Sequence, residues 1–163
     1  MRIGITGAHG VGKTMLAREL SRRLNLPLIE EQARVVAKIM GVRNCNELLK
    51  INDLARDFQV AVLMSQAAME EIFSRGFVSD RTTLDCLAYW RLYGLKESGV
   101  YAGKCLSREY DLLVYVPRRE EFGELDGIIA GILRNVPAPV VEVSGPPEGA
   151  LKTIERELKK RWT

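Results

Sequence analysis

Residues 5–14 read Ile-Thr-Gly-Ala-His-Gly-Val-Gly-Lys-Thr, and this stretch decides the fold. It contains the pattern Gly-x-x-x-x-Gly-Lys-Thr, with Gly7, Gly12, Lys13 and Thr14 at the fixed positions. An apolar run precedes the pattern and a helical period follows it, which is the strand–loop–helix context of a phosphate-binding loop, or P-loop. Motif and context together favour a P-loop over a chance glycine turn.

The chemistry of such a loop predicts its ligand. Its glycines allow backbone N–H groups to surround phosphate oxygens, and the positive end of the following helix points at them. Lys13 is expected to reach the β- and γ-phosphates of a nucleoside triphosphate, and the Thr14 hydroxyl to ligate Mg²⁺. The residues predicted to contact this nucleotide are Gly7, Ala8, His9, Gly10, Val11, Gly12, Lys13, Thr14 and Met15. His9 stands at a variable position of the motif, where a filler residue is favoured over a role beside the substrate.

Apolar runs bounded by turn residues predict buried parallel strands. The clear runs are Arg2–Thr6, Phe77–Ser79 and Leu112–Val116, and two weaker ones are Leu26–Ile29 and Pro139–Val143. Helical patterns alternate with them at Val11–Leu24, Asp53–Phe73, Thr82–Leu92, Glu124–Leu133 and Glu148–Arg161. The spacing Thr82-x-x-Asp85 predicts a capping box at the start of the third of these helices. The alternation predicts one α/β domain over residues 1–163, with a parallel sheet covered on both faces. The segment Tyr93–Gly103 is expected to be a mobile loop.

Composition argues against several classes of protein. The 163 residues carry a formal net charge of +3, too small to indicate nucleic-acid binding, and their basic side chains alternate with acids as on solvated helix faces. Three dispersed cysteines and one histidine do not make a zinc site. There is no apolar run long enough for a membrane span and no signal-peptide pattern, so a cytoplasmic protein with reduced thiols is predicted.

Polar residues follow the second and third predicted strands. In open α/β sheets ligands bind beyond the carboxyl ends of the strands. Asp80 stands where a magnesium-binding or acid–base carboxylate belongs, and Arg81 is expected to point at phosphates. Glu30 and Arg34, with the neighbouring Glu31, are expected to hold an acceptor. The alternative for each is a helix cap or a surface ion pair, and function is favoured because of the position in the sheet.

The roles of two further groups of residues stay open. Arg118 and Arg119 follow the fourth strand and are predicted to act as lid arginines on the substrate, although a solvated helix start is equally consistent with Pro117–Glu121. The aromatic residues at the end of the Thr82–Leu92 helix are Tyr89, Trp90 and Tyr93. Stacking on a base or ring is one role for them, and core packing is favoured.

The assembled motifs resemble the P-loop ATPase and kinase family that includes the ribosylnicotinamide kinase domain of NadR, and more distantly thymidylate kinase. The matching pieces are ITGAHGVGKT at 5–14, EEQAR at 30–34, the helix with Gln59 and Gln66, and SDRTTLDCLAY at 79–89. Weaker matches are YDLLVYVP at 110–117 and VVEVSGPPEGALKTIEREL at 140–158. The resemblance therefore covers nearly the whole chain.

The resemblance implies a three-layer α/β/α sandwich with a five-stranded sheet in the order 2-3-1-4-5. It also implies ATP as phosphoryl donor and a small nucleoside-like acceptor between the ends of the second and third strands. Carried over by position, Lys13 and Thr14 serve ATP and Mg²⁺, Asp80 is the catalytic acid or base, and Arg34 and Arg81 contact the acceptor. The segment 118–123 is shorter than the arginine-rich lid usual in the family.

Two functions remain as hypotheses. The favoured one is a small-molecule kinase that transfers the γ-phosphoryl group of ATP to a hydroxyl or phosphate acceptor. The other is an NTPase or nucleotide-dependent switch that acts on a partner protein, which a short lid would also suit. The sequence has no Asn-Lys-x-Asp motif, so a guanine-specific switch is the weaker form of the second hypothesis.

Overall fold

The computed structural model describes residues 1–119 and 123–162, with the side chains of Cys45, Asn46 and Leu49 left out. Its centre is a five-stranded parallel sheet in the order β2-β3-β1-β4-β5. The strands are β1 (Arg2–Gly7), β2 (Leu28–Ile29), β3 (Phe77–Asp80), β4 (Leu112–Val116) and β5 (Val140–Glu142). The predicted α/β class and strand order are confirmed.

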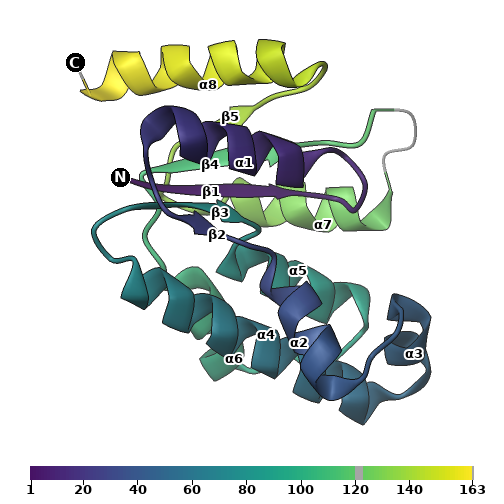
Figure 1. Ribbon diagram of the computed structural model, residues 1–163. Coiled ribbons are helices and arrows are strands. Elements are labelled where there is room, and N and C mark those ends of the chain that lie inside the picture. The colour runs from purple at the N-terminus through teal and green to yellow at the C-terminus, as the bar shows by residue number, and fades with distance from the viewer. Residues whose placement is uncertain (120–122, 163) are drawn as a thin grey trace.

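Helices cover both faces of the sheet, because successive side chains of each strand point to opposite sides. In β4, Leu112 and Val114 pack toward one face and Leu113 and Tyr115 toward the other. The first face is covered by α1 (Lys13–Leu24) and α8 (Pro147–Trp162), which lie above the sheet in Figure 1. Below it lie α2 (Gln32–Met40), α3 (Cys45–Lys50), α4 (Asn52–Ile72), α5 (Thr83–Leu92), α6 (Gly99–Leu106) and α7 (Glu124–Leu133). The result is the expected three-layer sandwich.

The predicted helices form within a few residues of their expected bounds. The helix after the P-loop begins at Lys13 and not at Val11, because Gly12 adopts a left-handed conformation with φ of 87°. The predicted capping box is confirmed: Thr82 accepts a hydrogen bond from the Asp85 N–H, and the Asp85 carboxylate accepts one from the Thr82 N–H. Helix α5 therefore starts at Thr83, directly after its cap residue Thr82.

The expectation of a mobile loop at Tyr93–Gly103 is wrong, because α6 begins inside it. The Ser98 hydroxyl caps this helix by accepting from the Tyr101 N–H at 3.1 Å. The Tyr101 ring stacks on Trp90 with 3.9 Å between ring centroids, and both side chains are buried. Burial of this aromatic pair holds the segment against α5. Within the part of the chain described, no helix is both long and apolar enough to cross a lipid bilayer.

Candidate active site

The P-loop connects β1 to α1 and has the backbone geometry of a phosphate cradle. A side chain at Gly7 is excluded, since a Cβ there would lie 2.2 Å from the carbonyl oxygen of Val116 on the neighbouring strand. Gly12, with its positive φ, turns the chain into α1. Lys13 is buried and its Nζ donates a hydrogen bond to the carbonyl oxygen of Ala8, across the loop. The loop therefore encloses its own lysine, and the contact of Lys13 with phosphates stays a prediction.

Lys13 is electrostatically prepared for an anion. Burial, and to a smaller degree the Arg81 cation, lower the pKa of its ammonium to about 8, although Asp85 and Asp80 partly oppose the change. A polyphosphate placed beside Lys13 supplies the negative charge that the buried ammonium lacks. The hollow over the loop, about 230 Å³, is lined by His9, Gly10, Gly12, Lys13, Thr14, Met15, Glu31, Arg34, Asp80 and Arg81. We call it the phosphate hollow.

Thr14, in the first turn of α1, and Asp80, at the end of β3, meet in this hollow. The Thr14 hydroxyl donates to Asp80 Oδ2 at 2.6 Å, and β3 places Asp80 opposite Ile5 of β1. Burial raises the pKa of Asp80, and the bond from Thr14 partly offsets this. Hydroxyl and carboxylate oxygens are ligands that suit Mg²⁺, which commonly takes few protein ligands together with phosphate and water. The described residues hold no group of three acidic, histidine or cysteine side chains for a metal.

Arg81 joins the P-loop to the ends of β2 and β3. Its Nη1 donates to the Gly7 carbonyl oxygen at 3.0 Å and to Asp85 Oδ1 at 3.1 Å, and its Nε donates to Glu31 Oε1 at 2.8 Å. The guanidinium also lies 5.3 Å from the centre of the Tyr89 ring. Arg81 has a positive φ of 88°, which is unfavourable for a side chain with a Cβ. Its contact with phosphates, predicted from the sequence, stays a prediction.

Asp85 has a larger part than the sequence suggested. Besides capping α5 it accepts from the Thr6 hydroxyl at 3.0 Å and from Arg81, and its side chain is almost fully buried. The signal was present in the sequence, because Arg81 and Asp85 are four residues apart, the spacing of an ion pair on one helix face. Sequence reasoning used Asp85 only as a cap.

A second cavity, about 430 Å³, opens beside the phosphate hollow, and we call it the acceptor cavity. Four of its residues also line the phosphate hollow: His9, Glu31, Arg34 and Arg81. Its remaining lining is largely apolar and comes from α2, α3, α4, α5 and the α2–α3 connection. These lining residues are Ala33, Ala37, Val42, Arg43, Asn44, Leu48, Phe58, Gln59, Val62, Thr82, Asp85, Cys86, Tyr89 and Tyr93. The two hollows therefore meet at a short row of charged side chains.

Glu31 is the carboxylate at that junction. Its Oε2 lies 2.7 Å from Arg34 Nε, and its other oxygen accepts from Arg81. Burial by itself would raise the pKa of Glu31, but the charge and hydrogen bond of Arg81, together with the charges of Arg34 and Lys13, outweigh burial, and the pKa is lowered. Glu31 is therefore ionised at neutral pH. Glu30, the acid singled out from the sequence, is exposed and lies outside the acceptor cavity, in a smaller hollow between α1 and α2.

Gln59 is a polar group that the sequence marked only through the family resemblance. Its residue is 4% exposed and lines the acceptor cavity, yet its side-chain amide makes no hydrogen bond within residues 1–119 and 123–162. Among the described residues Trp90 Nε1 is the only fully buried side-chain polar atom without a partner, so the Gln59 amide is open to the cavity, where a ligand can bond to it. Of the three aromatic residues considered, Tyr89 and Tyr93 line this cavity, whereas Trp90 packs into the core.

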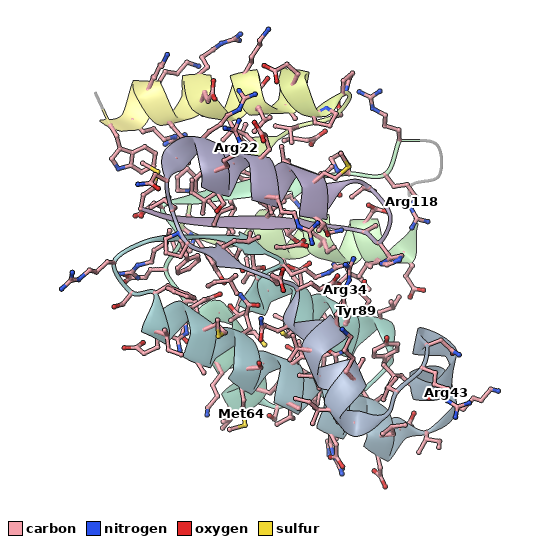
Figure 2. The ribbon with its side chains drawn as sticks, in the orientation of Figure 1. Arg22, Arg34, Arg43, Met64, Tyr89 and Arg118 are labelled. Atoms are coloured by element: carbon pink, nitrogen blue, oxygen red, sulfur yellow. The ribbon has the colours of Figure 1, made fainter. Side chains whose placement is uncertain are left out.

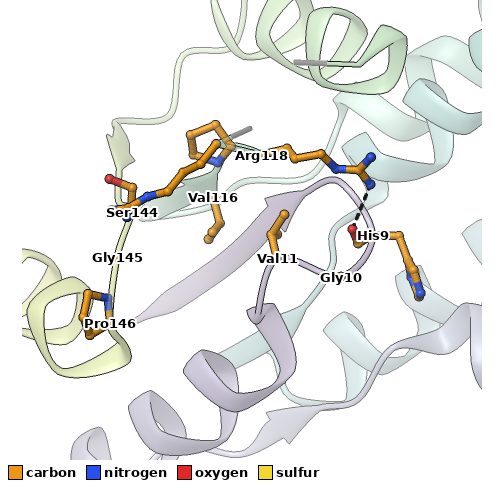
Figure 3. Close-up of a pocket in the computed structure, with 10 residues that line it drawn as sticks. His9, Gly10, Val11, Val116, Arg118, Ser144, Gly145 and Pro146 are labelled. Atoms are coloured by element: carbon orange, nitrogen blue, oxygen red, sulfur yellow. Dashed lines mark hydrogen bonds between the residues drawn. The ribbon is translucent and has the colours of Figure 1, made fainter. Parts of the chain in front are cut away.

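A third hollow, about 720 Å³, lies on the opposite side of the P-loop and is shown in Figure 3. It is lined by His9, Gly10, Val11, Val116, Pro117, Arg118, Arg119, Ser144, Gly145 and Pro146. Arg118 reaches across the loop, where its Nη2 donates to the His9 carbonyl oxygen at 3.0 Å. Both predicted lid arginines thus border this hollow and not the acceptor cavity. Glu120 and Glu121, named with them, lie outside the described residues.

A family model described as an AAA domain matches residues 2–146. The chain belongs to this family. The match includes the P-loop and all residues around the phosphate hollow and the acceptor cavity. Among curated proteins, none matches this AAA domain chain in sequence.

Solved structures share the fold of this AAA domain. The NadR protein in complex with NR superposes with a TM-score of 0.74 at 18% identity, over 94% of this chain and 50% of that one. The present chain thus spans about half the length of NadR. Deoxyadenosine kinase from M. mycoides, with the products dCMP and dCDP, has a TM-score of 0.69 at 14% identity over 98% of this chain and 100% of that one. YorR from Bacillus subtilis has a TM-score of 0.53 at 12% identity over 100% and 99%.

Proposed function

We propose that this protein is a small-molecule kinase that transfers the γ-phosphoryl group of ATP to a hydroxyl of a nucleoside-type acceptor. The observation that carries the proposal is the junction of two hollows at one carboxylate. The phosphate hollow and the acceptor cavity share Glu31, Arg34 and Arg81, so a triphosphate in one ends beside a molecule in the other. Three structures share this fold: a deoxyadenosine kinase, NadR in complex with NR, and YorR with a bound nucleotide. These likenesses support the proposal.

On the donor side, the backbone of the P-loop and the Lys13 ammonium hold the phosphates. Thr14 and Asp80 would hold Mg²⁺, which when bound neutralises charge on the β- and γ-phosphates. This assigns Asp80 to the metal, since its carboxylate already shares the Thr14 hydroxyl. The hollow bordered by Arg118 and Gly145 is open and large enough for the base of the nucleotide.

On the acceptor side, Glu31 is placed to take the proton of the attacking hydroxyl. It is ionised, it lies in both hollows, and the two arginines beside it hold it in position. Because Arg34 and Arg81 are already neutralised by acids, the junction favours an uncharged hydroxyl over an acceptor that brings a phosphate. Gln59 and the two tyrosines would bind a planar ring through one amide and two aromatic faces.

The competing function is an NTPase that needs no acceptor. The experiment is to measure ADP release from ATP·Mg²⁺ with and without a panel of nucleosides, together with direct detection of the phosphorylated nucleoside. The proposal expects one or more nucleosides to raise ADP release at least ~10-fold with one product formed per ADP. Equal ADP release with every nucleoside, and no phosphorylated product, would replace the kinase by an NTPase.

A further inference from the structure

Helix α4 carries an apolar ridge on its solvent face. Val60, Met64, Ala68 and Ile72 follow one another at intervals of four residues and are all exposed, with Met64 66% and Ile72 68% exposed. In Figure 2 the side chain of Met64 points away from the sheet into solvent. Of the twelve exposed large apolar side chains in the described residues, seven belong to α2, to α4 or to the residue before α4. A concentration of this kind on one part of a surface indicates an interaction site.

The spacing of the ridge fits another helix. Side chains four residues apart form a continuous ridge on a helix, and the ridges of two such helices interdigitate in the commonest class of helix packing. The 21 residues of α4 extend about 31 Å at ~1.5 Å per residue. With α2 beside it, joined by the bond from the Ser65 hydroxyl to Gln32, the face is about 20 Å wide. Because the nine residues of α2 extend only about 14 Å, the area of this face is on the order of 450 Å², about half of the roughly 800 Å² that each partner of a stable dimer buries.

We propose that the ridge packs against the same ridge of a second copy of this chain, antiparallel about a two-fold axis that passes near Gln66. The charges at the ends of the ridge are complementary in this arrangement. Asp57 lies on α4 nine residues before Gln66, and Arg75 lies nine residues after it, in the turn that follows the helix, so the axis brings each Asp57 to the end of the ridge that carries the Arg75 of the other copy. Two-fold symmetry forms this pair twice.

Both charged groups are available for that pairing. The Asp57 side chain is 64% exposed and is met only by the adjacent Arg56, at 3.4 Å. Arg75 is exposed, and its guanidinium has no ion pair within the described ranges 1–119 and 123–162. A parallel arrangement of the two helices would instead place like charges together, which is unfavourable.

The dimer also has a consequence for the acceptor cavity. The side of α4 that faces away from the ridge carries Phe58, Gln59 and Val62, which line that cavity. A second copy would therefore support the helix that forms one wall of each cavity. The dimer does not depend on the kinase activity, because the ridge contains none of the residues of the active site.

The test is sedimentation velocity of the full chain between 1 and 100 µM. The unmodified protein is expected to sediment as a dimer, and Met64→Glu is expected to raise the dimer dissociation constant at least ~100-fold, since each interface would contain two buried carboxylates. Trp162→Glu is the matched control, because Trp162 is 46% exposed on α8, which covers the opposite face of the sheet from α4, and should leave the dimer intact. A protein that is monomeric at 100 µM, or a dimer unaffected by Met64→Glu, would overturn the proposal.

The antiparallel register has its own test. Asp57→Arg should weaken the dimer at least ~10-fold, and the double variant Asp57→Arg with Arg75→Asp should restore it, because the pair is rebuilt with its signs exchanged. Failure of the double variant to restore association would contradict the two-fold arrangement. ADP release by the Met64→Glu variant separates the dimer from the proposed kinase activity. If the variant is monomeric and still releases ADP, the proposed function of the active site is unaffected.

Discussion

Glu31→Gln is the substitution that separates the proposed chemistry from nucleotide binding. It removes the carboxylate that lies in both the phosphate hollow and the acceptor cavity and keeps nearly the same volume. Loss of a general base costs about 10²- to 10⁴-fold in turnover. The lowered pKa of Glu31 makes it a weak base, and phosphoryl transfer has a loose transition state that needs little proton removal. We therefore expect the lower end, a fall in kcat of about 10²-fold.

The same geometry predicts that Glu31→Gln has small effects on stability and on ATP affinity. Arg81 keeps its bonds to Gly7 and Asp85, and the amide oxygen of the new side chain can still accept from it. The expected loss of stability is about 1 kcal/mol, which lowers Tm by roughly 2–4 °C in a chain of this size. ATP affinity should change less than ~3-fold, because the loop amides and Lys13 remain.

The assay is steady-state ADP release with the best acceptor, beside calorimetric measurement of the ATP dissociation constant. Glu30→Gln is the matched control, since this neighbouring acid is exposed and outside the acceptor cavity, and it should retain wild-type kcat. Turnover by Glu31→Gln within ~3-fold of the unmodified enzyme would refute the assignment of the base. An equal loss in the Glu30 variant would refute the geometric argument behind it.

Three further predictions concern the two hollows. Lys13 loses its proton as the pH rises through about 8, so ATP affinity should fall by up to about tenfold per pH unit above that value. Calorimetry that shows the same affinity from pH 7 to 9.5 would contradict this pH dependence. The variant Lys13→Ala should not bind ATP. Asp80→Asn should raise the Mg²⁺ concentration for half-maximal turnover at least ~10-fold without changing the acceptor KM, as a metal titration would show. Gln59→Leu should raise the acceptor KM at least ~10-fold and leave the ATP KM unchanged; equal changes in both would argue against acceptor binding.

Much of the fold follows from local sequence signals. Strand β4 was predicted with its observed bounds, because Leu112–Val116 is buried on both faces and reads as a continuous apolar run. The P-loop fixed the first strand, the first helix and their junction, since its glycines are required by the backbone. The capping box likewise placed the start of α5. These signals act within a few residues, so a single sequence contains all the information they need.

The helices that were missed have no such signal. Helix α6, Gly-Val-Tyr-Ala-Gly-Lys-Cys-Leu, contains two glycines and is unfavourable by propensity. Its stability comes from contacts distant in sequence, above all the stacking of Tyr101 on Trp90. For a related reason the sequence does not decide which of Glu30 and Glu31 enters the acceptor cavity. Adjacent residues at the turn from β2 to α2 point in different directions, and only the position of the turn decides which carboxylate enters the cavity.

The conformation of Arg81 shows why the site had to be read from the structure. No sequence signal predicts a positive φ at an arginine, and the strain is maintained because Gly7, Glu31 and Asp85 each accept from its guanidinium. Those three acceptors belong to the phosphate loop, the acceptor cavity and the start of α5. An acceptor that displaces Glu31 must therefore alter the bond from Arg81 to the Gly7 carbonyl oxygen. A nucleotide that moves the P-loop must in turn alter the bond from Arg81 to Glu31. If donor and acceptor act on Arg81 in this way, their binding is coupled, and because such coupling is reciprocal, each would change the affinity for the other by the same factor in the proposed kinase.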